Sequence, residues 1–444
     1  MPLNLGRPVW VDDPDFDLDF HLRRTALPAP GDETALARLV GRIMSQRLDR
    51  ERPLWEDWVI EGLPDGRWAL LSKVHHCMVD GVAGNQLYRL MCDTTPETGP
   101  AVVDHWHPRP DGGTIDLTLD ALGQLARVPF EQMRLITRAA RVPGMAATQA
   151  RETLRGLAAI AAAFAPGTPT SLSGPLGRAR RYAVARTPLT DLTAVAKEHG
   201  VTVNDVYLAV VAGAFRRLML SRGEEPAADA VRTLVPVSVR HPDDGALDNR
   251  LASVLLLLPV DMADSVDRLA AVHGRIAELR ENREVEAGAR LLALADREPF
   301  AAVAFGVRAA LRIPQRAIVT VTTNVPGPRE QLYLLGRPIR EILPYVPIAE
   351  RMRIGVSMFT YRGQAAFGVT TDFASVPEAD AFAADINAEI RTLTTAGKDP
   401  VPAPAIHRTP ARRSPQKSAK PRVAAAPARA LAAERATPRR RKDS

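Results

Sequence analysis

The spacing of apolar residues changes repeatedly along this chain, from the alternation typical of strands to the three- and four-residue spacing typical of helices. Leu36, Leu39, Val40 and Ile43 recur at helical spacing on one face. Because both periods occur, we expect an α/β fold of the α+β kind, with mixed sheets covered by helices. In the first part of the chain the patterns predict strands over residues 9–22, 55–63 and 68–76, a turn at 64–66, and helices over 33–48 and 85–92.

A second stretch of the same kind begins near residue 180. Between the two, residues 94–113 are rich in Pro, Gly and Asp, residues 117–164 have an Ala-rich helical pattern, and residues 166–177 have a loop composition. Beyond it we expect strands over 232–239, 251–260, 317–324, 353–361 and 365–371, and helices over 189–198, from about 203 to 220, 265–281, 378–393 and in two segments up to 313. The predicted division is an N-terminal half (1–113), a helical crossover (114–179), a C-terminal half (180–397) and a tail (398–444).

The basic character of the chain lies in that tail. The net charge is +7, but the last 46 residues hold 12 of the 58 Lys and Arg and only 3 of the 51 Asp and Glu, so the remainder carries about −2. Few large apolar residues occur there, so we expect this segment to be disordered. It either attaches electrostatically to anionic lipid, with nucleic acid the less favoured partner, or is a solvated extension without a special role.

The two cysteines, Cys77 and Cys92, are too few for a disulfide framework. Both are expected to be buried free thiols. No signal peptide is recognised and no apolar run reaches the roughly 20 residues needed to span a bilayer, so a cytoplasmic protein that meets lipid only from the surface is expected.

The run His75-His76-Cys77-Met78-Val79-Asp80-Gly81 follows an apolar strand and is the strongest candidate for a reactive site. Adjacent histidines on a strand point to opposite faces, so only one of them can face a given cleft. A neutral imidazole is suited to removing a hydroxyl proton during attack on an activated acyl carbon. Gly81 permits a sharp turn after Asp80.

Several alternatives to this interpretation remain open. A His-His pair is often purely structural, and Asp80 either polarises His76 or forms a structural ion pair with an arginine. A metal site built from these side chains is disfavoured, since neighbouring strand histidines diverge and the chain shows no other metal-ligand spacing. A serine nucleophile is poorly supported because no Gly-x-Ser-x-Gly elbow occurs.

Further polar candidates lie outside this run. Thr202 or Asn204 is expected to cap the helix that follows, and Asn204 alternatively supports a developing oxyanion. Asn324 precedes Pro-Gly-Pro, so it either shapes a turn or lines a binding channel. The segment Pro53-Leu54-Trp55 is expected to shape the fold rather than take part in chemistry.

Together these motifs resemble one acyltransferase family. The His-His-x-x-x-Asp-Gly run resembles the active-site motif of the superfamily that includes chloramphenicol and carnitine acyltransferases and peptide-synthetase condensation domains. The order of five motifs narrows this to the bacterial wax ester synthase/diacylglycerol acyltransferases, and the likeness covers about residues 5–395. These motifs are Pro53-Leu54-Trp55-Glu56, the His run, Val203-Asn204-Asp205-Val206, Val235-Pro236-Val237-Ser238-Val239-Arg240 and Asn324-Val325-Pro326-Gly327-Pro328.

The resemblance implies that the second histidine, His76, is the general base. It also implies two pseudo-symmetric chloramphenicol-acetyltransferase-like domains joined by a crossover, with a tunnel between them that acyl-CoA and a lipid alcohol enter from different sides. Acyl-CoA is then a substrate, and no cofactor is expected. Neither the acceptor alcohol, the acyl length nor the oligomeric state follows from the sequence.

One departure from the family pattern produces two rival expectations. Family sequences usually carry a Leu-Asp and aromatic motif before the Gly-Arg-Pro-x-Trp region, which here is Gly6-Arg7-Pro8-Val9-Trp10. We expect either an upstream in-frame extension or a catalytically impaired, lipid-binding paralogue. A condensation-type enzyme that uses carrier-protein thioesters is the other alternative.

Overall fold

A computed structural model describes residues 9–75, 77–78, 91–97, 105–109, 113, 118–119, 123, 167–238, 251–281, 317–349 and 351–396. The predicted helix over 85–92, most of the crossover, the two helices up to residue 313 and the basic tail lie largely or wholly outside these residues.

The first part of the chain forms a three-stranded sheet in the order β1-β2-β3. Strand β1 (Leu22–Ala26) pairs in parallel with β2 (Trp55–Glu61), and β2 pairs antiparallel with β3 (Ala69–Val74). The turn η2 (Pro64–Gly66) joins β2 to β3, with Asp65 at φ 59°. The parallel β1–β2 connection contains helix α2 (Glu33–Ser45), as a parallel crossover requires.

The prediction of a strand over residues 9–22 is wrong. Residues Leu18–His21 form the short helix α1, and β1 begins only at Leu22. The alternation of Leu18, Phe20 and Leu22 looked strand-like. However, the Asp17 side chain accepts a hydrogen bond from the Asp19 backbone, and this local cap starts a helical turn.

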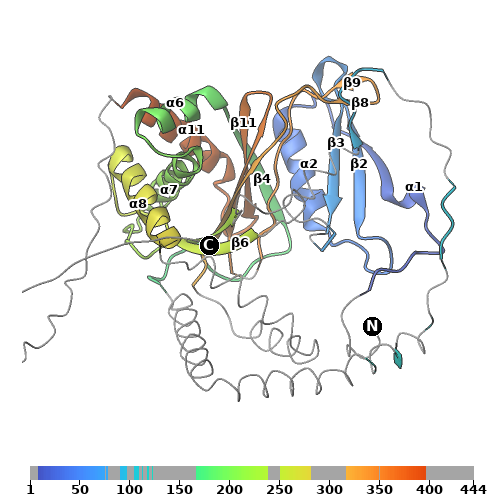
Figure 1. Cartoon of the computed structure of the whole chain (residues 1–444), viewed down its shortest axis with the longest axis horizontal. Coiled ribbons are helices and arrows are strands. Elements are labelled where there is room, and N and C mark those ends of the chain that lie inside the picture. Colours follow the sequence, from blue (N-terminus) through green and yellow to red (C-terminus); the bar gives the residue numbers. More distant parts are fainter. Residues whose placement is uncertain are drawn as a thin grey trace, which may run out of the picture. The chain divides into compact units, whose positions relative to one another are not determined.

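The second part forms a six-stranded mixed sheet in the order β4-β11-β10-β7-β5-β6. Helices α6, α7, α8 and α11 gather beside this sheet (Figure 1). The strands are β4 (Arg180–Pro188), β5 (Arg232–Ser238), β6 (Leu251–Leu257), β7 (Thr320–Pro326), β10 (Ile354–Tyr361) and β11 (Gln364–Asp372). The helices are α6 (Leu189–Glu198), α7 (Val203–Ser221), α8 (Ser265–Glu281) and α11 (Ala379–Thr395). All these elements except β4 were predicted from the sequence to within a few residues, whereas for β4 only the start of a second α/β unit near residue 180 was expected.

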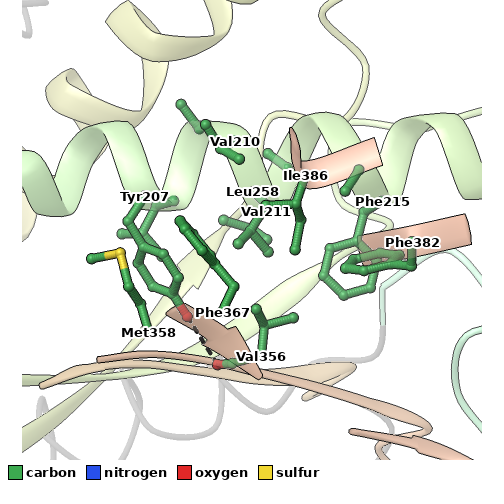
Figure 2. Packing of buried hydrophobic residues seen from close by; sticks show 14 of the residues in the cluster. Tyr207, Val210, Val211, Phe215, Leu258, Val356, Met358, Phe367, Phe382 and Ile386 are labelled. Carbon is green, nitrogen blue, oxygen red and sulfur yellow. Dashed lines mark hydrogen bonds between the residues drawn. The ribbon is translucent and has the colours of Figure 1, made fainter. Parts of the chain in front are cut away.

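Helix α7 is the centre of the hydrophobic core. Its residues from Asp205 to Phe215 are all buried, so it is covered on every side. Phe215 meets Phe382 of α11 edge to face, with ring centroids 5.0 Å apart (Figure 2). The Tyr207 hydroxyl donates to the Val356 carbonyl at 2.9 Å, which satisfies a polar group inside the core (Figure 2). Each such aromatic side chain contributes about 1.5–3 kcal/mol by burial.

Helix α2 connects the small sheet to the large one. Gly41 lies so close to β4 that an added Cβ would be 2.7 Å from the Arg180 carbonyl oxygen. The Ser45 hydroxyl accepts a hydrogen bond from the Arg180 N–H at 2.8 Å. Arg186 of β4 pairs with Glu33 at 2.6 Å and with Glu341 at 2.8 Å. Contacts at both ends of α2 therefore fix it along the outer edge of β4.

A small hairpin supplies a further connection between distant parts of the chain. Strands β8 (Tyr333–Leu334) and β9 (Arg337–Pro338) pair with each other. Tyr333 also exchanges two backbone hydrogen bonds with Asp93, at 2.8 and 2.9 Å. The segment that follows the histidine run is thereby attached to the C-terminal part of the chain.

Candidate active site

The histidine run begins where β3 ends. The Trp55↔Val74 pair is the last of the β2–β3 ladder, and one further hydrogen bond runs from the His75 N–H to the Leu54 carbonyl at 2.9 Å. The chain then turns, since the Met78 N–H donates to the His75 carbonyl at 2.9 Å. Strand β3 therefore ends before the histidine pair, whereas the strand was predicted to reach residue 76. The two histidines are not neighbours on a strand, so strand geometry does not direct their side chains to opposite faces.

His75 is directed back onto its own turn. Its Nδ1 accepts a hydrogen bond from the Cys77 N–H at 3.2 Å and lies 3.0 Å from the Cys77 sulfur. A neutral His75 accordingly carries its proton on Nε2. Cys77 is exposed rather than buried as predicted, whereas Cys92 is half-buried, and burial raises the pKa of the Cys92 thiol. His76, Asp80 and Gly81 lie outside the described residues.

Pro53-Leu54-Trp55 supports the strand that leads into the histidine run. Besides the Leu54–His75 bond, the Trp55 carbonyl accepts from His21 Nδ1 at 2.7 Å, and the two rings stack with centroids 4.5 Å apart. Phe16 also stacks on the His21 ring, with centroids 5.3 Å apart, and lies 6.5 Å from the Trp55 ring. His21 is 1% exposed, so it is a packed core histidine. This aromatic cluster was not recognised from residue spacing.

Lys73 fixes the end of β3 against α2. It is buried, and its Nζ donates to the Ile43 and Gln46 carbonyls, at 3.2 and 2.7 Å, at the C-terminal end of α2. Burial lowers the pKa of Lys73 despite the nearby Glu56 carboxylate. A cation at the C-terminus of a helix also meets the negative end of its dipole. Lys73 therefore holds the strand two residues before His75.

Asn204 and Asn324, far apart in the sequence, lie in contact. The Asn324 amide donates to Asn204 Oδ1 at 3.4 Å, and both residues are partly buried. Thr202, one of the two predicted caps, is the N-cap of α7, and Asn204 lies inside the first turn. The prediction that Asn204 caps the helix is therefore wrong. Its Nδ2 hydrogens are not used in the bond to Asn324, so they remain potential donors to a ligand.

Asp205, the next residue, was named from the sequence only as part of a motif, and no role of its own was predicted for it. Its carboxylate accepts from the Thr202 N–H at 2.9 Å and lies 2.9 Å from Nδ1 of His273 on α8. The Thr-x-x-Asp spacing of a capping box was present in the sequence and identifies half of this arrangement. The partner His273 depends on how α7 and α8 pack, which the spacing does not reveal.

Among the described residues, no group of three or more His, Cys, Asp and Glu side chains is arranged to hold a metal ion. The helices within those residues include none that is long and apolar enough to cross a bilayer. A cavity of about 330 Å³ lies among Gly167, Thr168, Asp229, Val319 and Arg351. It adjoins the start of β7, whereas Asn324 is five residues further on, about 16 Å along the strand. This cavity is therefore not the site described above.

Comparison with known proteins identifies the family. The catalytic domain profile of the wax ester synthase/diacylglycerol acyltransferases matches residues 1–207, and the profile of the C-terminal domain of that family matches residues 247–394. A probable diacylglycerol O-acyltransferase, tgs1, of Mycobacterium tuberculosis strain H37Rv is 39% identical over 400 residues, which cover 89% of this chain and 83% of that protein. This chain belongs to the wax ester synthase/diacylglycerol acyltransferase family.

Two further matches agree with this family. A second putative diacylglycerol O-acyltransferase of the same M. tuberculosis strain is 34% identical over 88% of this chain and 79% of its own length. The wax ester synthase/diacylglycerol acyltransferase of Marinobacter aquaeolei VT8 superimposes with a TM-score of 0.60 at 26% identity, covering 88% of this chain and 83% of that structure. The mixed α/β fold predicted for this acyltransferase is confirmed. The predicted domain boundaries and site residues stay predictions.

Proposed function

We propose that this acyltransferase moves a fatty acyl group from acyl-CoA to the hydroxyl of diacylglycerol, of a long-chain alcohol, or of both. The observation that carries the proposal is the family membership, which extends over most of the chain. The relatives at 39% and 34% identity bear the name diacylglycerol O-acyltransferase, which favours diacylglycerol as an acceptor. The CoA leaves as a product of the reaction, so no cofactor is needed.

In the proposed mechanism His76 is the general base. It takes the hydroxyl proton while the alcohol oxygen forms a bond to the thioester carbonyl carbon. A tetrahedral oxyanion results. When the carbon–sulfur bond breaks, the CoA thiolate leaves and takes the proton from His76. The anchoring of β3 by Lys73 and of His75 by the Leu54 carbonyl supports this role, because both contacts fix the chain just before His76.

Asn204 and Asn324 are proposed to position the reacting carbonyl. The bond between them orients both amides, and the Nδ2 hydrogens of Asn204 are left as donors for the oxygen that becomes negative. Asp80 is proposed to steady the loop after His76. The two substrates are proposed to reach His76 through a tunnel between the two halves of the chain.

The basic tail is proposed to hold the enzyme at anionic lipid, on the inner membrane or on lipid droplets. The 12 Lys and Arg against 3 Asp and Glu in the last 46 residues favour attraction to a negative surface. Such attachment brings the catalytic part of the chain to an acceptor that resides in lipid.

Exchange of His76 for alanine tests the mechanism. General base catalysis contributes about 10²–10⁴-fold, so His76→Ala is expected to lose that much activity. Thioester cleavage is measured as released CoA thiol, with palmitoyl-CoA and either dioleoylglycerol or hexadecanol. His107→Ala, at an exposed histidine outside the motif, is the matched control and keeps wild-type activity.

Equal rates of the His76→Ala variant and the wild type, with both folded by circular dichroism, would refute the role of His76. Wild-type protein that binds anionic vesicles but releases no CoA would instead identify a lipid-binding paralogue. Turnover of acyl-pantetheine carriers but not of acyl-CoA would identify a condensation-type enzyme.

A further inference from the structure

A buried carboxylate directly follows Asn204 on α7. Asp205 is 1% exposed, and its Oδ2 accepts from the Thr202 N–H at 2.9 Å, while the Asp205 N–H donates to Thr202 Oγ1 at 3.2 Å. This capping box fixes the backbone at the start of α7. An ionised carboxylate offers about four acceptor positions, so one backbone N–H does not satisfy it.

His273 is the side chain that completes this arrangement. Its Nδ1 lies 2.9 Å from Asp205 Oδ2, and because an ionised carboxylate only accepts, the proton lies on Nδ1. The other carboxylate oxygen, Oδ1, is buried and has no hydrogen-bond partner among the residues that the structure describes. Within that part of the chain, Asp205 therefore has two donors on one oxygen and none on the other. Loss of His273 would remove the only side chain seen to bind this carboxylate within the described residues.

The helix that carries His273 is itself held firmly. Arg268 of α8 pairs with Glu389 of α11, and both are buried. Arg275, about two turns further along α8, donates to the Leu257 carbonyl of β6 at 2.6 Å. His273 lies between these two attachments, so its imidazole projects from a fixed backbone onto Asp205.

We propose that His273 is a positioning residue, which acts through Asp205 to fix the first turn of α7 and so holds Asn204 against Asn324. The inference rests on the proposed function, because that function assigns Asn204 to the substrate carbonyl. Without the donor on Nδ1, the Asp205 carboxylate reorients and the first turn of α7 shifts with it. A shift of about 1 Å at a reacting group can cost about 100-fold in rate.

Substitution of His273 tests the proposal. His273→Ala is expected to lower kcat about 10- to 100-fold, with KM for acyl-CoA changed less than threefold, because the affected contact acts on the developing oxyanion. His273→Asn restores most of kcat, since its amide N–H can occupy the place of Nδ1–H, whereas His273→Gln places its donor elsewhere and does not. If the Ala variant does not fold, the contrast between Asn and Gln decides the question.

A double-mutant cycle separates positioning from general loss of stability. In an Asn204→Ala background, His273→Ala is expected to cost no further activity, because both changes affect the same contact. Asp267→Ala, at an exposed position in the first turn of the same helix, is the matched control, expected to lower the unfolding temperature slightly through the helix dipole while leaving kcat unchanged. Fully additive losses in the cycle, or equal kcat for the Asn and Gln variants, would overturn the proposal.

An Asn204→Ala variant with wild-type activity would overturn the oxyanion role assigned to Asn204. A His76→Ala variant with wild-type activity would overturn the proposed mechanism independently of this test.

Discussion

Asp372, at the end of β11, connects segments that are far apart in the sequence through its carboxylate. Its Oδ1 accepts from the Gly177 N–H at 2.6 Å and lies 3.5 Å from Arg180 Nη1, and its Oδ2 accepts from the Ser375 hydroxyl at 2.7 Å. Burial raises the pKa of this carboxyl, but the hydrogen bonds from Ser375 and Gly177 and the charge of Arg180 outweigh burial. The pKa therefore lies below its ordinary value of 3.8.

Asp372 is accordingly expected to stabilise the fold in its ionised form. Because its pKa is lowered in the folded state, the stabilisation is present above pH 3.8 and is lost as the pH falls through the folded-state pKa. Asp372→Asn should lower the free energy of unfolding by about 1.5–3 kcal/mol near neutral pH, and the difference from wild type should vanish in acid. Urea unfolding at several pH values measures this.

The exposed Glu225, exchanged for Gln, is the control for that series and should change stability by less than about 0.5 kcal/mol at every pH. A difference between Asp372→Asn and wild type that persists unchanged well below pH 3.8 would show that the carboxylate charge is not the cause.

Among the elements, helix α2 approaches the backbone of β4 closely. Gly41 faces the Arg180 carbonyl of β4, and Ser45, one turn on, accepts from the Arg180 N–H. Glycine in a helix interior is normally unfavourable by about 1 kcal/mol relative to alanine. Here the absence of a Cβ is what allows the helix to lie against the strand.

Gly41→Ala should therefore destabilise the protein although alanine is the better helix former. The new Cβ would be 2.7 Å from a backbone oxygen that cannot move aside freely. Overpacking of this kind costs about 1–3 kcal/mol, which exceeds the gain in helix propensity. Chemical denaturation measures the change. Arg42→Ala, at the exposed neighbouring position of α2, should stay within about 0.5 kcal/mol, and an increase in stability for Gly41→Ala would contradict the packing described.

Most elements could be predicted because their apolar periods are local properties. Helix α2 and strands β2 and β3 were recognised from residue spacing alone, and Thr202 was recognised as a cap candidate from its place before an apolar run. Helix α1 was missed because a side-chain cap from Asp17 outweighs the alternating pattern. The order of the motifs along the chain also indicated the family. Each short motif alone occurs in many proteins, but the five in this order are specific for one family.

The contacts of the site could not be predicted in the same way. Asn204 meets Asn324 because β7 lies between β10 and β5 in the sheet, an order that hydrophobic patterns do not specify. The partnership of Asp205 with His273 likewise depends on which turns of α7 and α8 face each other. Lys73 looked like an ordinary strand residue, and only the packing of α2 on β3 shows that it caps a helix.

On the scale of the whole molecule, the guanidinium of Arg186 joins separate parts of the chain. It pairs with Glu33 at the start of α2 and with both carboxylate oxygens of Glu341. All three side chains are more than a third exposed. Exposed pairs of this kind contribute about 0–1 kcal/mol each, so Arg186 helps to align the two sheets rather than to hold them together.

Arg186→Met should lower the free energy of unfolding by about 1 kcal/mol at low salt and by much less in about 1 M NaCl, where the Debye length is about 3 Å. Urea unfolding at the two salt concentrations measures this. Arg24→Met removes an exposed pair with Glu61 inside the small sheet and is the matched control, with a smaller effect expected at low salt. A loss for Arg186→Met that is equal at both salt concentrations would point to lost packing instead of lost charge.

Helix α2 covers the outer edge of β4, so a fragment of the chain without α2 leaves that edge exposed. A fragment that starts after residue 166 retains every strand of the large sheet but lacks the helix along its outer edge, including the Ser45 hydroxyl that binds the Arg180 N–H. Such a polypeptide presents a nine-residue strand with unsatisfied backbone groups, which is a template for pairing between molecules. Expressed alone, it would tend to associate edge to edge, and supplying the N-terminal piece in trans would restore its solubility.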